Sequence, residues 1–391
     1  MLVKKRACIF LLVISVLSLV ACGVDSSEKA TKLNDEQLNT VDQPYWSIYT
    51  HNVTCGAGGY YYIDNNLVKY IKDDGESTVL CNKPDCRHDS ADCAANLSSQ
   101  DKSEGVHFGG YMGQMLYYHN GKVYVMYNEE SRSGKVYLDE IAGDGSYRNR
   151  LFEIGSCNSA YALVFHDDDV YIYLKEGSVS GREENTAIIR KRSLDGKKDE
   201  IVYSYKDKGA TVFALKSYGR YLYFLEESYD RDNGADGYKR KGLFRYDYAT
   251  GNVDKVVDEQ ITDYTFDTEG GMLYYYVYNS GLYKLALSDA DVEKIYDASD
   301  GVTNVCQISY LNGNVYVSND MFYAFYGVNP KESYISVISS TGELENKVTF
   351  DKESIYYVMF GDDKRIFINT GSGIYSAKLD NNSNYNWEKV E

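Results

Sequence analysis

Residues 270–296 read GGMLYYYVYNSGLYKLALSDADVEKIY. A glycine turn is followed by a tyrosine-rich run of strand length, then by a second run, a polar turn at Ser288 and Asp289, and a third run. Aromatic and β-branched residues bounded by Gly, Ser, Asn and Asp are typical of strands joined by tight turns. Because LYYYVY is apolar on both faces, we expect these strands to be covered on both sides.

The same turn and tyrosine-rich strand recur along the chain. They begin at Gly59, Gly121, Asp168, Gly219, Gly270, Gly313 and Asp363. A period of about 50 residues, with strands covered on both faces, is typical of β-propeller blades, which stack side by side in a ring. Only 3 of the 391 residues are prolines, so few strands are interrupted.

We therefore predict an all-β fold, a seven-bladed β-propeller of four-stranded antiparallel blades over residues 43–391. Residues 46–49, which begin at Trp46, are expected to form a strand of the first blade. An eight-bladed ring that uses the region of Trp46 separately is one alternative. Two β-sandwiches are another, although they would not share one period along the whole chain.

The N-terminus predicts export. A basic start (residues 4–6) precedes an apolar stretch (7–20), which together are typical of a secretory signal over residues 1–21. The sequence LVACG (19–23) resembles a bacterial lipobox, in which the thiol matching Cys22 receives a diacylglycerol and becomes the new N-terminus. Two acyl chains anchor stably, so we expect attachment to the extracytoplasmic face of the cell membrane. A plain signal peptide and an uncleaved anchor are the alternatives.

Residues 22–42 hold no aromatic residue and are polar, which predicts a flexible, lipidated tether between the membrane and the propeller. The chain carries a formal net charge of −17. Removing the three basic residues 4–6 with the signal makes the mature protein more negative still. Such a surface repels phosphate backbones, so nucleic acid is excluded as a partner.

A cluster of cysteines follows the first repeat, where CNKPDCRHDSADC (81–93) lies in an insertion over residues 81–107. Zinc favours four Cys or His ligands, and the segment offers Cys81, Cys86, His88 and Cys93 as a structural site without an open position. In an oxidising compartment Cys55 would complete an even set for disulfides instead, such as Cys55 with Cys81 and Cys86 with Cys93. Free thiols are the third alternative.

Sequence motifs for catalysis are missing. The run GSVSG (177–181) has valine where a G-x-S-x-G nucleophile would stand. The run HDDD (166–169) falls at a predicted turn, and His107 and His119 have no partner motif. Most of the 41 tyrosines are expected to fill the space between blades, and some on loops at one end could stack on sugars or peptides. The aromatic run 321–326 could instead stack on a ligand.

The lipobox, the tyrosine-rich repeats and LCNKPDCRHDSADC (80–93) together resemble a family of surface lipoproteins of Gram-positive anaerobes. Its β-propeller domain is related to the low-density-lipoprotein-receptor type. The resemblance implies a lipid-anchored extracytoplasmic module. From the missing catalytic motifs we predict binding or scaffolding toward a surface glycan, peptide or protein, without catalysis. The alternatives are a glycan or peptide hydrolase or lyase with its site in the central channel, and a structural component of an envelope complex.

Overall fold

The computed structural model describes residues 52–56, 58–72, 75–97, 115–128, 134–156, 160–177, 181–267, 269–298, 307–318, 334–350, 355–370, 372–379 and 385–390. Throughout these ranges the chain is almost entirely β-strand. Its one helix there is the 3₁₀ turn η1 (Arg231–Gly237). No helix among the described residues has the length and apolar character needed to cross a membrane.

The strands form seven four-stranded sheets, each an antiparallel meander of consecutive strands. In chain order they are β1 (Val53–Gly56), β2 (Gly59–Asp64), β3 (Leu67–Lys72), β4 (Ser77–Val79); β5 (Met115–His119), β6 (Lys122–Asn128), β7 (Lys135–Ala142), β8 (Arg148–Ser156); β9 (Ala160–His166), β10 (Asp169–Gly177), β11 (Glu184–Ser193), β12 (Asp199–Lys208); β13 (Thr211–Tyr218), β14 (Tyr221–Tyr229), β15 (Tyr238–Asp247), β16 (Val253–Val257); β17 (Ile261–Asp267), β18 (Met272–Val277), β19 (Gly281–Ala286), β20 (Val292–Asp297); β21 (Gln307–Leu311), β22 (Asn314–Ser318), β23 (Ile335–Ser339), β24 (Leu344–Val348); β25 (Ile355–Gly361), β26 (Arg365–Thr370), β27 (Gly373–Lys378) and β28 (Glu388–Lys389).

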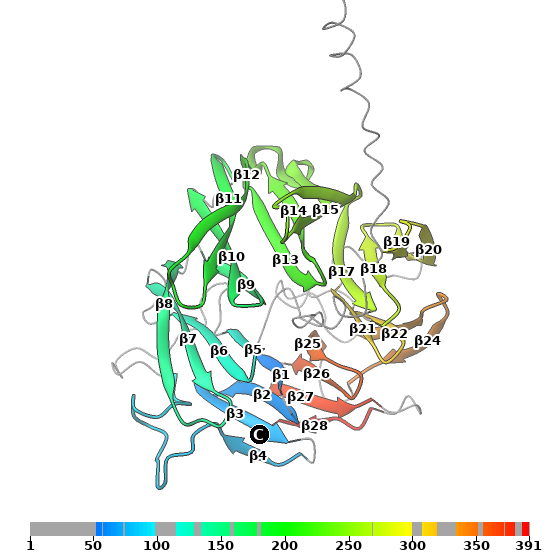
Figure 1. Ribbon diagram of the computed structural model, residues 1–391. Coiled ribbons are helices and arrows are strands. Elements are labelled where there is room, and N and C mark those ends of the chain that lie inside the picture. The colour runs from blue at the N-terminus through cyan, green and yellow to red at the C-terminus, as the bar shows by residue number, and fades with distance from the viewer. Residues whose placement is uncertain are drawn as a thin grey trace, which may run out of the picture.

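The sheets are the blades of a propeller. Figure 1 shows them around a ring, with the first strand of each blade nearest the centre and the blue first blade beside the red last one. The predicted seven-bladed, four-stranded antiparallel architecture is confirmed by this topology. The tyrosine-rich strand found in each repeat is the second strand of its blade. The innermost strand of the first blade is β1, whereas residues 46–49 lie outside the described residues.

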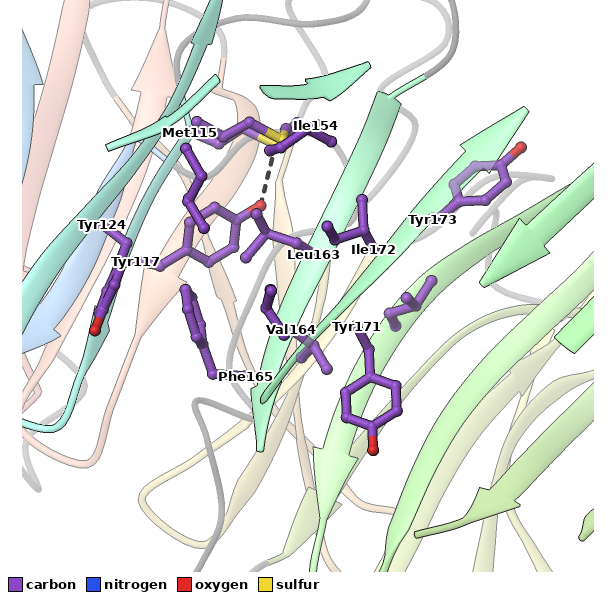
Figure 2. Close-up of a cluster of buried hydrophobic side chains, with 14 of the residues drawn as sticks. Met115, Tyr117, Tyr124, Ile154, Leu163, Val164, Phe165, Tyr171, Ile172 and Tyr173 are labelled. Atoms are coloured by element: carbon purple, nitrogen blue, oxygen red, sulfur yellow. Dashed lines mark hydrogen bonds between the residues drawn. The ribbon is translucent and has the colours of Figure 1, made fainter. Parts of the chain in front are cut away.

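Tyrosines fill the space between blades, as predicted. The ring of Tyr124 in blade 2 lies 4.6 Å from that of Phe165 in blade 3, and Tyr117 lies 5.9 Å from the same ring (Figure 2). Tyr117 is fully buried, and its hydroxyl donates to the Met115 sulfur at 3.3 Å. At Tyr117 a large ring thus supplies buried apolar area while its one polar atom finds a hydrogen-bond partner.

Side chains close the ring between the last and first blades. In the described part of the chain each sheet uses consecutive strands, so no strand is exchanged between these blades. The Tyr60 hydroxyl on β2 donates to the Asp362 carboxylate at 2.9 and 3.1 Å, and the Tyr60 ring meets Phe367 of β26 edge-on at 5.0 Å. Burial and the neighbouring Asp362 charge raise the pKa of Tyr60, so this hydroxyl stays a donor.

Candidate functional site

The predicted cysteine and histidine ligands come together in the structure. They lie in residues 81–97, here called the Cys/His loop, which leaves the outermost strand of blade 1, β4, at the rim of the ring (Figure 1). One donor atom from each of Cys81, Cys86, His88 and Cys93 lies within 4.8 Å of the other three. This Cys₃His cluster could hold a metal ion.

The cluster suits a tetrahedral ion. Bond lengths typical of zinc place ligand atoms about 3.5–3.8 Å apart around a tetrahedron. The His88 Nδ1 to Cys93 Sγ distance, 3.4 Å, is close to that value. Asp85 and His88 adopt left-handed backbone conformations, with φ of 55° and 58°, which turn the loop tightly enough for four donors to converge. Four ligands leave no position for a reacting water, so the chemistry is that of a structural site.

The thiols of the cluster differ in acidity. Burial raises the pKa of Cys93 to about 12; a hydrogen bond with the Ala95 backbone opposes it, and the neighbouring thiols of Cys81 and Cys86 add to it. Burial also opposes ionisation of Cys81, but hydrogen bonds from the Lys83 backbone and from the Cys86 and Cys93 thiols outweigh it, and its pKa is lowered. Since a coordinated metal deprotonates its thiols outright, binding would displace a proton from Cys93.

Cys55 takes no part in this cluster. It lies on β1, at the opposite edge of its sheet from β4, and its sulfur is 3.8 Å from an Asp362 carboxylate oxygen in blade 7. All four described cysteines are free thiols, so neither suggested disulfide is formed. Without Cys55 the loop holds three cysteines, an odd number that suits a Cys₃His site better than paired disulfides.

The predicted turn over residues 166–169 is confirmed, since Asp167 and Asp168 form the exposed β9–β10 turn. His166 stacks on Tyr248 of the next blade, with ring centroids 3.6 Å apart. His119, for which the sequence shows no partner motif, is buried, and its Nε2 lies 2.6 Å from the Asp167 carbonyl oxygen of the next blade. Cys22, His107 and the aromatic run 321–326 lie outside the described residues.

Sequence reasoning missed a buried ion pair on the inner strands. Lys216 of β13 and Asp263 of β17 have exposed side-chain fractions of 1% and 0%, and their charged atoms are 3.4 Å apart. Lys216 also donates to the Tyr264 carbonyl. Because both groups are fully enclosed, burial lowers the pKa of Lys216 and raises that of Asp263.

Two β-bulges aim these charges at each other. The register of β13 with β14 shifts between Phe213 and Lys216, where Ala214 has φ of +52°. The register of β17 with β18 shifts between Ile261 and Asp263. Each bulge changes the side to which the following residues point. Asp263 also accepts the Ile308 N–H of blade 6 at 2.9 Å, so one carboxylate joins three blades.

A second buried carboxyl lies between blades 3 and 4. Glu226 on β14 is 4% exposed and accepts a hydrogen bond from the Tyr203 hydroxyl. Burial raises its pKa to about 7, although Lys255 and Lys241 act in the opposite direction. Buried polar contacts thus join blades 3 and 4 as well as blades 4 to 6.

Comparison with known proteins gives no family. No protein-family model matches the chain, and no curated protein does. Among solved structures, the WD40 β-propeller domain of Doa1 aligns with 88% of this chain and 99% of its own, at 13% identity and a TM-score of 0.48. An oligogalacturonate lyase in complex with manganese aligns with 69% of this chain and 73% of its own, at 12% identity and a TM-score of 0.47.

Porphyromonas gingivalis dipeptidyl peptidase 4 aligns over 89% of this chain and 54% of its own, at 11% identity and a TM-score of 0.45. The chain therefore spans about half the length of that peptidase. The fold assignment rests on the sheet topology itself, with seven consecutive four-stranded meanders in a ring.

Proposed function

We propose that this chain is a lipid-anchored extracytoplasmic β-propeller that binds a glycan, peptide or protein without transforming it. The Cys/His loop is its structural zinc site. The proposal extends the resemblance to Gram-positive surface lipoproteins, and it places the propeller beyond the tether that follows Cys22. The observation that supports it is that the two faces of the ring carry connections of different length.

Strand directions separate the connections into two sets. Those between the first and second strands of a blade are tight turns, such as Asn120–Gly121 and Asn312–Gly313, and most of those between third and fourth strands are also short. The other face receives the second-to-third connections, of which 230–237 is described throughout. Long, variable connections on a rigid scaffold are the usual carriers of recognition.

The face that carries the second-to-third connections is here called the recognition face. Among its described residues is an exposed aromatic group. Tyr238, at the end of the 230–237 connection, is 43% exposed and lies beside Tyr229, with ring centroids 6.1 Å apart. The Arg240 guanidinium lies 5.4 Å from the Tyr238 ring. Its loop is held by Asp230, which accepts the Asp232 N–H at 3.1 Å. A fixed, exposed ring with a guanidinium beside it suits stacking on a sugar or a peptide side chain.

The binding test uses two exposed tyrosines. Tyr147 is 38% exposed but precedes β8, in a turn of the opposite face. In a screen of surface glycans and peptides, Tyr238→Ala is expected to weaken binding of a hit about tenfold or more, whereas Tyr147→Ala leaves it unchanged. Equal loss in both variants would contradict the recognition face. Product formation lost on replacing an inner-strand Asp, Glu or His would favour the enzyme alternative.

The anchor has a separate test. Because the Cys22 thiol is the acyl acceptor in a lipobox, Cys22→Ala is expected to abolish labelling by a radioactive or clickable fatty acid. The precursor should then remain uncleaved or be released. Normal labelling of this variant would refute the anchor and leave the binding proposal to its own test.

A further inference from the structure

The first blade has a short outer edge, and among the described blades only blade 7, whose β28 has 2 residues, has a shorter fourth strand. Its fourth strand, β4, has 3 residues, whereas β8 and β12 have 9 and 10. β4 pairs with Lys69–Ile71 alone, so the start of β3 would lack a partner on that side. Among the described residues, the contacts between blade 7 and blade 1 that we identify are made by side chains such as Tyr60 and Asp362, so contacts with blade 2 matter for holding blade 1 in place.

The Cys/His loop completes that edge. After β4 the chain leaves β3, turns through the four ligands, and returns so that Asn96 bridges to Leu67. The Val68 N–H donates to the Ala95 carbonyl at 2.9 Å, and the Leu97 N–H donates to the Asn66 carbonyl at 2.8 Å. The end of the loop thus takes the place of a longer fourth strand.

The same loop reaches blade 2. The Asn82 N–H donates to the Gly145 carbonyl at 3.2 Å, and the Arg148 guanidinium donates to the Asn96 carbonyl. Asp139 fixes Arg148 in turn, at 2.8 Å. Buried side chains of the loop share one core cluster with both blades; they are Cys93, Ala94, Ala95 and Leu97, packed with Val68 and Leu80 of blade 1 and with Val123, Val125 and Ile141 of blade 2.

The ligands stand where these attachments begin and end. Cys81 directly follows Leu80, and Cys93 directly precedes the segment that pairs with β3. Between them, most of residues 82–92 are exposed, so few apolar contacts hold this part in shape. Joining Cys81 to Cys93 through a metal would close the loop and remove much of its freedom, as a covalent cross-link does.

We infer that the metal-closed Cys/His loop is a clasp that fastens blade 1 to blade 2 in place of a full fourth strand. This inference rests on the proposed zinc site and assigns it a task. The clasp acts at the blade 1–2 interface, and blades 4 and 5 do not depend on it.

Hydrogen exchange on the full chain tests the clasp. Zinc content is measured first, and exchange is then followed with zinc bound and after removal by a chelator. Removal is expected to speed exchange about tenfold or more in residues 59–72 and 115–142, with no change in residues 211–257. Zinc bound at one per chain without this local change would overturn the clasp but keep the site. Absence of bound zinc would overturn both.

Two matched glycine variants test the attachment without replacing a ligand side chain. Gly145 and Gly196 occupy corresponding turns of blades 2 and 3, and both have φ of 71°. A Cβ at Gly145 would lie 2.6 Å from the Leu80 carbonyl carbon and 2.7 Å from the Cys81 nitrogen, whereas none of the heavy atoms considered lies within 4 Å at Gly196. Both alanine variants therefore carry the same backbone strain, and Gly145→Ala alone pushes against the loop.

Gly145→Ala is expected to retain zinc and to speed exchange in residues 59–72 and 115–142. Gly196→Ala should leave exchange in those residues as in the parent. Equal behaviour of the two variants in these blades would overturn the clasp, because the strained turn and not the contact with the loop would then be responsible.

Discussion

The Cys/His loop and the Lys216–Asp263 pair are both polar devices that join neighbouring blades, but they work in opposite ways. The loop gathers four ligands from a short stretch of chain at the rim, and much of it is exposed. The pair joins residues from two blades at the inner strands, and solvent does not reach it. Disrupting a local cluster at the rim should destabilise only the structure near it. A buried charge left without its partner, in contrast, lowers the free energy of unfolding of the whole fold.

Breaking the buried pair should have the largest effect. Lys216→Met leaves the Asp263 carboxylate enclosed without its counter-charge, and we expect the free energy of unfolding to fall by about 3–5 kcal/mol. Urea unfolding followed by circular dichroism at neutral pH measures it. Unlike chelation at the rim, the substitution should speed exchange across blades 4 to 6 and leave zinc content unchanged.

A double substitution serves as the control for that effect. Lys216→Met combined with Asp263→Asn removes both charges, while the Asn oxygen still accepts the Ile308 N–H. Much of the lost stability should return, because replacing a buried pair by neutral groups is often nearly neutral. If the double variant is no more stable than Lys216→Met alone, lost packing and not an uncompensated charge explains the cost.

The sequence predicts these two regions unequally. The repeats locate the second strand of every blade, and the spacing of its cysteines and histidine locates the Cys₃His cluster, because both signals are local. Lys216 and Asp263 do carry a signal, a single charge within the strand-like runs FALKSY (213–218) and ITDYTF (261–266). Their pairing depends on two bulges and on the stacking of blades about 50 residues apart, which no local pattern encodes.

Glu226 extends the comparison to pH, because burial of its carboxyl outweighs the opposing effect of the Lys255 and Lys241 charges. Its pKa rises from 4.5 to about 7 in the fold. The folded state therefore favours the protonated form. Its contribution is full below pH 4.5 and is lost as the pH rises through about 7, at a cost of about 3 kcal/mol above that range.

Glu226→Gln should remove this dependence. Its amide oxygen can still accept the Tyr203 hydroxyl, so the variant should exceed the parent in stability by about 2–3 kcal/mol at pH 8 and by little at pH 5. Urea unfolding of both proteins at the two pH values gives the difference. A constant difference between parent and variant at both pH values would show that Glu226 does not titrate in this range.

Removing a contact that closes the ring should give the smallest loss of stability. It also tests which two blades that contact joins. Tyr60→Phe removes one hydroxyl that ties blade 1 to Asp362 of blade 7, while Asp362 keeps the backbone N–H groups of Lys364 and Arg365. We expect the free energy of unfolding to fall by about 1 kcal/mol, measured by thermal unfolding.

Tyr62→Phe is the matched control, because the Tyr62 hydroxyl forms a hydrogen bond with Ser77 within the same blade at 2.7 Å. If closure depends on side chains, Tyr60→Phe alone should speed exchange in both blade 1 and blade 7, since they share this tie. Faster exchange confined to blade 1 in both variants would mean that the tie contributes no more to closure than a hydrogen bond inside a blade.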